Sequence, residues 1–128
     1  MHLSFINTRG QAGLDAPPIT VEVHLSAGLP AFHVVGLGES RSREIRSRVR
    51  AALISSHLKW PDFNITVNLT PAERVIPGTR FDLPIAVGLL VASQQLPTDA
   101  IEGREFIGEL GLDGCLKPSR GALAAVLA

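Results

Sequence analysis

The chain has 128 residues, with 12 Lys and Arg against 12 Asp and Glu, so its formal net charge is zero at pH 7. This balance excludes recruitment of nucleic acid or a membrane by overall charge, and any such partner needs a local patch. Hydrophobic residues make up 45% of the sequence, which is typical of a globular domain with a buried core. The one cysteine, Cys115, excludes an internal disulfide and fits a reducing compartment, so we expect a cytoplasmic protein.

We expect neither an export signal at the start of the chain nor a membrane-spanning segment. Residues 1–5 lack the basic start and apolar run of a signal peptide. The apolar run from Leu83 to Ala92 is about half of the roughly 20 residues that a membrane helix needs, so we expect no membrane partner. Residues 121–128 begin a helical pattern without a stop signal. We therefore expect a single domain, residues 1–128, taken from a longer protein.

Three strands are expected first. Residues 1–8 fit a short strand, and residues 19–25 alternate between apolar and polar side chains. Residues 31–35 follow a turn at 26–30, which predicts that they return beside residues 19–25 as a hairpin. His24 and His33 would then lie on neighbouring strands.

A helix is expected next, from an N-cap at Ser40 to about His57. Its apolar residues recur at helical spacing and form one stripe. The stripe consists of Ile45, Val49, Ala52 and Leu53.

The second half of the chain alternates strands and helices. We expect a strand at 64–69, a long polar loop, a buried helix entered through Phe81-Asp82-Leu83-Pro84, strands at 105–110 and 115–117, and a last helix from about Gly121. The order predicts an α/β (α+β) fold, with a mixed sheet and helices mainly on one face. The loop of about a dozen residues exceeds an ordinary connection, and such loops in compact domains are often functional.

Basic side chains concentrate on the helix expected after Ser40, where five arginines fall between residues 41 and 50. At 100° per residue, three of them lie along one edge of the apolar stripe and two along the other. They can hold the phosphates of DNA or an acidic partner surface. The simpler alternative is a solvated helix whose arginine stems cover the rim of the core. The candidate DNA-binding residues are Arg41, Arg43, Arg46, Arg48, Arg50 and Lys59, with Arg74 and Arg80 in the long loop.

Other motifs give weaker signals. Gly36 and Gly38 supply two glycines of a dinucleotide-binding turn, but Arg41 stands at the third position, which favours a plain tight turn. The four histidines and the cysteine lack metal-ligand spacing. Glu109 and Asp113 flank a turn, where carboxylates are usually solvated. No G-x-x-x-x-G-K-[ST] motif occurs, so we expect no catalytic residue, metal, cofactor or ATP hydrolysis in this chain.

Six segments together carry a resemblance to a known family. They are residues 21–25, 28–36, 48–53, 66–72, 78–86 (Gly-Thr-Arg-Phe-Asp-Leu-Pro-Ile-Ala) and 108–114 (Gly-Glu-Leu-Gly-Leu-Asp-Gly). In this order and spacing they resemble the opening of the ComM/YifB family of bacterial AAA+ ATPases, which are related to the magnesium-chelatase ATPase subunit. The resemblance covers essentially the whole chain.

The resemblance implies a domain in the ribosomal protein S5 domain 2-like fold, similar to the Lon proteolytic domain. It also implies a full-length protein with a downstream AAA+ module that uses ATP and Mg. Such a protein would be a hexameric helicase that drives DNA branch migration in natural transformation. Its partners would be single-stranded or branched DNA and further copies of itself.

Lon-like proteases use a serine and a lysine, and the matching positions fall near Arg80 and Leu123. Neither side chain can replace them, and Thr79 has no matched base. The chain also departs from the ComM/YifB pattern, with Gly38 in place of a proline and Ile76-Pro77 in place of a Lys-Glu pair. A DNA contact by the loop would therefore be weaker, or would depend on Arg74 and Arg80 instead.

Two functions stay open at this point. The first is a non-catalytic domain of a ComM-like helicase that contacts DNA or organises the hexamer. The alternative is a pure oligomerisation or regulatory module of a magnesium-chelatase-like ATPase, with no DNA contact. A residual hydrolase is disfavoured because Thr79 lacks a base.

Overall fold

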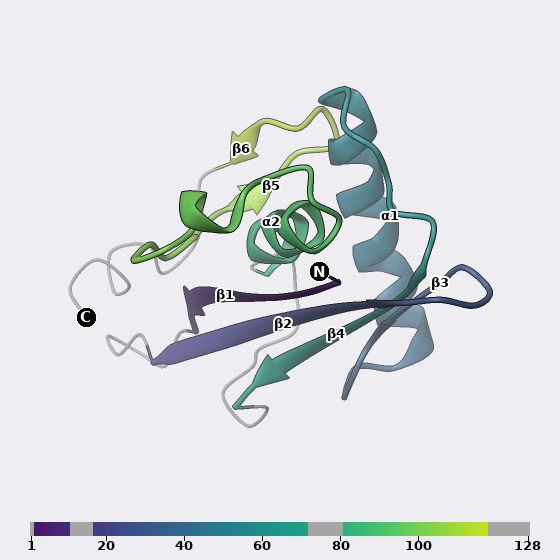
Figure 1. Cartoon of the computed structure of the whole chain (residues 1–128), viewed down its shortest axis with the longest axis horizontal. Helices are drawn as coiled ribbons and strands as arrows, with labels where there is room; N and C mark the ends of the chain where they lie inside the picture. The colour runs from purple at the N-terminus through teal and green to yellow at the C-terminus, as the bar shows by residue number, and fades with distance from the viewer. Residues whose placement is uncertain (1, 11–16, 72–80, 118–128) are drawn as a thin grey trace.

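The computed structural model describes residues 2–10, 17–71 and 81–117. Their elements are β1 (Leu3–Arg9), β2 (Pro18–Ser26), β3 (Ala31–Val34), α1 (Glu39–Ser55), β4 (Asn64–Thr70), α2 (Asp82–Ala92), a 3-10 turn (Thr98–Ala100), β5 (Glu109–Leu110) and β6 (Leu116–Lys117). This confirms the predicted α/β (α+β) class, with a mixed four-stranded sheet and both helices on one side of it (Figure 1). The helix expected from Gly121 and the long loop at 72–80 lie outside the described residues.

The main sheet has the strand order β1-β2-β4-β3. β2 pairs antiparallel with β1 and β4, and β3 runs parallel to β4. The predicted hairpin of residues 19–25 and 31–35 is therefore wrong, because β4 lies between the two strands. His24 and His33 are not neighbours, and each is paired with Thr66 from opposite sides of β4. Alternation identifies a strand, but it does not choose the strand's partner.

Alternation does predict which face of each strand is buried. On β2, Ile19, Val21, Val23 and Leu25 have at most 2% of their surface exposed. They face α2, which lies against β1 and β2, while α1 packs on β3 and α2. The opposite face of the sheet carries polar residues such as Thr66 and is open to solvent. The core therefore lies between the sheet and the two helices.

α1 begins earlier than predicted. Its N-cap is Gly38, which offers no side-chain hydrogen bond, so the predicted N-cap at Ser40 is wrong. The Ser42 N–H donates to the Gly38 carbonyl at 3.0 Å, and the Ser42 hydroxyl accepts a bond from the Val34 N–H at 3.0 Å. The helix is thereby joined to the end of β3. The predicted apolar stripe is confirmed, with all of Ile45, Val49, Ala52 and Leu53 buried.

The strands after α2 are shorter than predicted. β5 and β6 form a small antiparallel pair of two residues each. The start of the expected first strand, Glu105, instead makes a parallel bridge with Asn7 at the edge of β1. Residues 105–110 thus contact the main sheet at Glu105 and form the small β5–β6 sheet at Glu109–Leu110. Within the described ranges, neither helix combines the length and the apolar character needed to cross a membrane.

Candidate nucleic-acid interface

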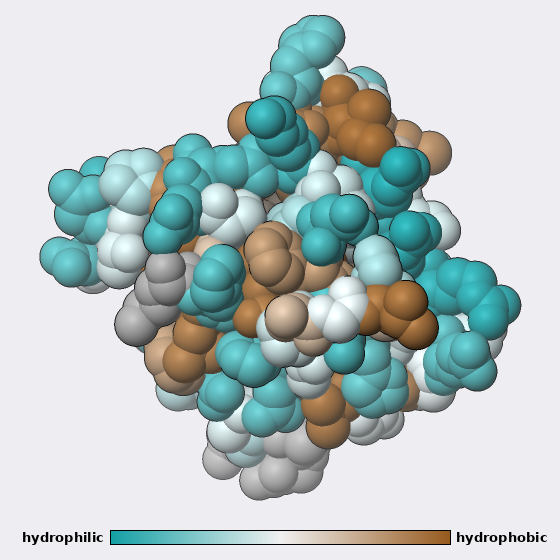
Figure 2. All heavy atoms as spheres, turned by 45° about the vertical axis from the view of Figure 1, so that its right-hand side comes forward, coloured by the Kyte–Doolittle hydropathy of each residue, from teal (hydrophilic) through white to brown (hydrophobic). Residues whose placement is uncertain are grey.

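α1 exposes most of its arginines. Four of the five predicted there have exposed side chains, and Arg43, Arg46 and Arg50 follow one edge of the helix over about 10 Å. The side of the molecule with α1 comes forward in Figure 2, where hydrophilic atoms spread between smaller hydrophobic groups. The exposed set on α1 is Arg41, Arg43, Arg46 and Arg50.

The Arg43 side chain makes only a weak ion pair, with Glu39. Its Nη2 lies 3.6 Å from Glu39 Oε1, one helical turn away, and both side chains are largely exposed. Water screens such a surface pair, which contributes little to stability. The Arg43 guanidinium can therefore exchange Glu39 for a stronger anion at small cost.

Arg46 lies over an aromatic ring that the sequence analysis did not single out. Its guanidinium carbon is 5.6 Å from the ring centroid of Trp60, within the range of a cation–π contact. Trp60 is half-buried and lies 5.8 Å from the ring of Phe32 on β3. The sequence offered one signal for this cluster, a tryptophan directly after the basic Lys59.

Lys59 directly precedes Trp60 in the chain. Its backbone N–H donates to Gln95 Oε1 at 2.9 Å, and its carbonyl accepts from Gln95 Nε2 at 2.8 Å. These two bonds fix the main chain beside Trp60 and leave the Lys59 side chain exposed. We call Arg43, Arg46, Arg50, Lys59 and Trp60 the basic–aromatic surface.

Arg48 has a different environment from the other arginines of α1. Its Nε donates to Asp82 Oδ2 at 2.6 Å and its Nη2 donates to Asp82 Oδ1 at 3.2 Å. The Asp82 side chain is fully buried, whereas 25% of the Arg48 side chain is exposed. This two-point ion pair joins α1 to the first residue of α2. Sequence reasoning could not find it, because spacing does not show that Asp82 points inward.

Burial and the ion pair shift the pKa of the Asp82 carboxylate in opposite directions. Burial raises the pKa of Asp82, since the loss of water outweighs the hydrogen bond from Arg48 that lowers it. The hydrogen bond to Asp82 raises the pKa of Arg48, which stays charged in any case. The pair is therefore a structural contact between α1 and α2.

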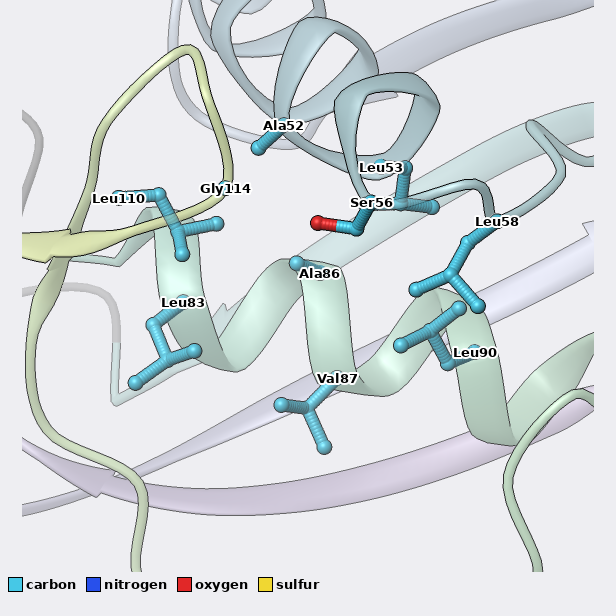
Figure 3. A pocket seen from close by; sticks show the side chains of 10 residues that line it. All are labelled: Ala52, Leu53, Ser56, Leu58, Leu83, Ala86, Val87, Leu90, Leu110 and Gly114. Carbon is cyan, nitrogen blue, oxygen red and sulfur yellow. The ribbon is translucent and has the colours of Figure 1, made fainter.

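An apolar pocket lies between the two helices and the β5–β6 turn (Figure 3). Its volume is about 150 Å³, and Leu53, Leu83, Leu90 and Leu110 are among its lining residues. The Ser56 hydroxyl is the one side-chain oxygen among the labelled residues of the pocket. A pocket of this composition can hold an apolar group, but no acidic or basic side chain of the described residues lines it beside the Ser56 hydroxyl.

The other residues considered for chemistry do not form a site within the described ranges. The Asp113 carboxylate accepts a bond from the Cys115 N–H at 3.0 Å and so shapes the β5–β6 turn. The backbone of Glu109 lies opposite that of Lys117 in the β5–β6 pair. No cluster of three His, Cys, Asp or Glu side chains is found where the structure describes the chain. Arg74, Thr79, Arg80 and Leu123 lie outside the described residues.

Comparison with known proteins identifies the family. The model of the family described as subunit ChlI of Mg-chelatase matches residues 21–128. YifB of Escherichia coli K12 is 48% identical over 125 residues, which are 98% of this chain and 25% of that protein. Competence protein ComM of Haemophilus influenzae is 46% identical over 128 residues, or 100% of this chain and 25% of ComM.

A more distant relative is the Mycobacterium tuberculosis protein Rv2897c, which is 40% identical over 116 residues, or 91% of this chain and 23% of that protein. The chain thus spans about a quarter of the length of the curated relatives it matches. The chain belongs to the ChlI family of magnesium-chelatase subunits, as an N-terminal domain of its ComM/YifB branch.

Proposed function

We propose that this domain is a non-catalytic, DNA-contacting part of a ComM-like ATP-dependent helicase. The observation that carries the proposal is the basic–aromatic surface, above all Arg46 over the half-buried ring of Trp60 with Lys59 beside it. In a chain of zero net charge, such a concentration of cations supplies the local patch that a polyanion requires.

Each class of side chain on this surface has a distinct role in the proposal. Arg43, Arg46 and Arg50 bind backbone phosphates, and each contact releases condensed counterions from the DNA. Trp60 offers its exposed surface to an unpaired base, because stacking on aromatic rings is how single strands are held without sequence preference. Single-stranded or branched DNA is therefore the proposed ligand.

The wider function is proposed for the whole protein. By its relation to ComM, the full-length protein is a hexamer that uses ATP and Mg to drive DNA branch migration during natural transformation. In that assembly the domain guides a DNA strand toward the ATPase ring. The domain positions the DNA strand, and the rest of the protein binds and hydrolyses ATP.

Fluorescence anisotropy tests the proposal directly. The 128-residue chain is titrated into labelled single-stranded, forked and duplex DNA at low and moderate salt. We expect salt-sensitive binding that favours single-stranded and forked DNA. Replacing Arg43, Arg46 and Arg50 together by Ala is expected to weaken it at least about 100-fold, since each phosphate contact contributes on the order of 1 kcal/mol.

A matched control separates the surface from a general loss of charge. Arg104 is exposed on the segment that covers the edge of β1, at the far side of the sheet from α1. Replacing Arg104 by Ala is expected to leave the affinity within about twofold. Equal losses for Arg104→Ala and for Arg46→Ala would contradict the proposal.

An assembly role without DNA contact is the second candidate, and a separate observation favours it. Ile54, Leu58 and Leu112 are exposed by 46%, 36% and 60%. Ile54 and Leu58 lie at or just after the end of α1, and the Ser55 hydroxyl there donates to the Leu112 carbonyl at 2.9 Å. Figure 2 shows hydrophobic atoms near the top of the molecule, where α1 ends in Figure 1.

Sedimentation distinguishes the two candidates. Self-association that is abolished by Leu112→Ser, combined with no anisotropy change for any of the three DNA forms, would establish assembly as the function. DNA binding that survives Leu112→Ser and is lost with the three arginines supports DNA guidance.

A further inference from the structure

β1 is an edge strand of the main sheet (Figure 1), and its backbone groups alternate in direction. The His2 carbonyl accepts from the Leu25 N–H at 2.7 Å, which directs the even-numbered residues toward β2. The Asn7 carbonyl accepts from the Phe106 N–H at 2.9 Å on the opposite side. The N–H and C=O groups of Leu3 and Phe5 therefore point outward from the sheet.

A segment of the chain covers this edge at one end. Glu105 bridges Asn7, and the Arg9 Nε donates to Glu105 Oε1 at 2.7 Å, which holds the segment in place. Gly103, just before this segment, has a left-handed backbone with φ of +69°. Within the described ranges, no backbone segment pairs with the outward groups of Leu3 and Phe5.

The uncovered edge borders open space. A cavity of about 370 Å³ is lined by Phe5, Val91 and Ile101 among others, and an adjoining one of about 250 Å³ shares Leu3, Val91 and Thr98 with it. Phe5 is 53% exposed. Unpaired strand groups beside apolar space are the two elements that a domain needs to accept an added strand: main-chain bonds for affinity and pockets for alternate side chains.

The charges around this edge are mainly acidic. Glu102 lines the larger cavity, Asp99 follows Thr98 on its wall, and Glu22 is paired with Phe5 across the open face of the sheet. Arg104 is the exposed cation nearby, since Arg9 is paired with Glu105. A ligand with basic side chains on either side of an apolar one complements this distribution.

We propose that the outer edge of β1 at Leu3–Phe5 binds an extended, basic–apolar peptide segment of a partner protein as an added strand. A second copy of the chain is a poorer occupant, because its own β1 edge is bordered by the same acidic side chains. The added strand receives bonds from the N–H groups of Leu3 and Phe5 and donates to their carbonyls. Its apolar side chains enter the space lined by Val91 and Ile101. Its basic side chains alternate with them and point to the open face, on the side of Glu22, while the exposed Glu102 and Asp99 add to the attraction.

The test uses the 128-residue chain and a fluorescein-labelled pentapeptide, Lys-Val-Thr-Val-Lys, read by anisotropy. We expect saturable binding, with backbone amide shifts in the NMR spectrum at Leu3, Phe5 and Gly103. Phe5→Pro removes the outward N–H and no bond to β2, which an edge strand tolerates. It is expected to weaken binding at least about fivefold more than Phe5→Ala, which keeps the N–H.

Two further arms keep the test decisive even if the proline variant does not fold. The same pentapeptide with every amide N-methylated cannot donate to the strand, and it is expected not to bind the unmodified protein. Glu102→Gln is expected to weaken binding of the unmethylated probe several-fold at low salt. Equal affinity for the methylated probe, or no saturable binding at roughly millimolar protein, where the weakest specific complexes are still detected, overturns the proposal.

Discussion

At the scale of single residues, the contact between Asp82 and Arg48 decides how α2 starts. Asp82 has no exposed side-chain surface, and Arg48 reaches it with two bonds from α1. A buried carboxylate without a cation is costly, whereas the intact pair adds little over a neutral contact. Breaking the pair is therefore costly, although the intact pair itself adds little stability, and the pair holds the start of α2 against α1.

Replacing Arg48 by Met tests this interpretation. The change keeps much of the side-chain volume and leaves the Asp82 charge unpaired, so the free energy of unfolding is expected to fall by about 3 kcal/mol. Adding Asp82→Asn to the same chain removes the unpaired charge and is expected to recover part of that loss. Urea unfolding measures both variants. Arg41→Met, an exposed arginine of the same helix, is the control and is expected to change stability by less than about 0.5 kcal/mol.

The pKa of Asp82 gives a pH-dependent prediction with a definite sign. Burial raises it above its ordinary value of 3.8, so the folded state binds the proton more tightly than the unfolded state does. The resulting stability is fully present below pH 3.8 and is lost as the pH rises through the raised pKa. The free energy of unfolding of the unchanged chain, minus that of Asp82→Asn, is expected to increase as the pH falls from 7 toward 4. A difference that decreases with falling pH would contradict the role of burial.

At the scale of elements, α2 and the sheet approach closely at Gly88. A Cβ at this position would lie 2.6 Å from Val23 Cγ2 and 3.2 Å from the Ser4 hydroxyl oxygen. The same hydroxyl donates to the Gly88 carbonyl at 2.7 Å, so β1 is bonded to the helix where they meet. A glycine inside a helix normally lowers its stability, and here the close packing accounts for it.

Gly88→Ala is therefore expected to destabilise the domain, although alanine is the better helix former. The stiff, β-branched Val23 cannot move aside, and overpacking costs about 1–3 kcal/mol. Gly38→Ala is the control for a glycine in open space, because nothing lies within 4 Å of a Cβ there and its φ is −62°. Since alanine is a poorer N-cap than glycine, this change is expected to cost up to about 1 kcal/mol and no steric penalty. Thermal unfolding of the two variants measures the difference. An increase in Tm for Gly88→Ala would show that the helix can move away from the sheet.

The same scale shows what the sequence can predict. Periodicity located β2, β4 and α1 and identified their buried faces, and the continuous apolar run located the buried α2, because burial acts on each element separately. Periodicity did not predict the pairing of β3. The strand lies beside β4, which is distant in the sequence, and not beside β2, to which the preceding turn connects it. For the candidate surface, charge located the arginines, but the ring under Arg46 and the carboxylate bound to Arg48 come from other elements. Spacing along one helix contains no information about such contacts.

At the scale of the whole molecule, 12 basic and 12 acidic side chains leave no net charge to attract DNA from a distance. Any affinity has to come from contacts at the basic–aromatic surface, and their number is small. This limits how strongly salt can act on binding, since the slope of log K against log[salt] counts the phosphates that are neutralised. A domain that bound DNA through diffuse positive charge would show a much steeper dependence.

Four phosphate contacts, from Arg43, Arg46, Arg50 and Lys59, predict a slope of about −3 on single-stranded DNA. With the three arginines replaced by Ala the slope is expected to fall to about −1, because one counterion-releasing contact is left. Anisotropy titrations at a series of salt concentrations measure both slopes. Trp60→Ala tests the stacking contribution separately, since it is expected to lower the affinity roughly tenfold or more with an unchanged slope. A slope that changes with Trp60→Ala but not with the arginines would place the phosphates elsewhere on the domain and contradict the proposed surface.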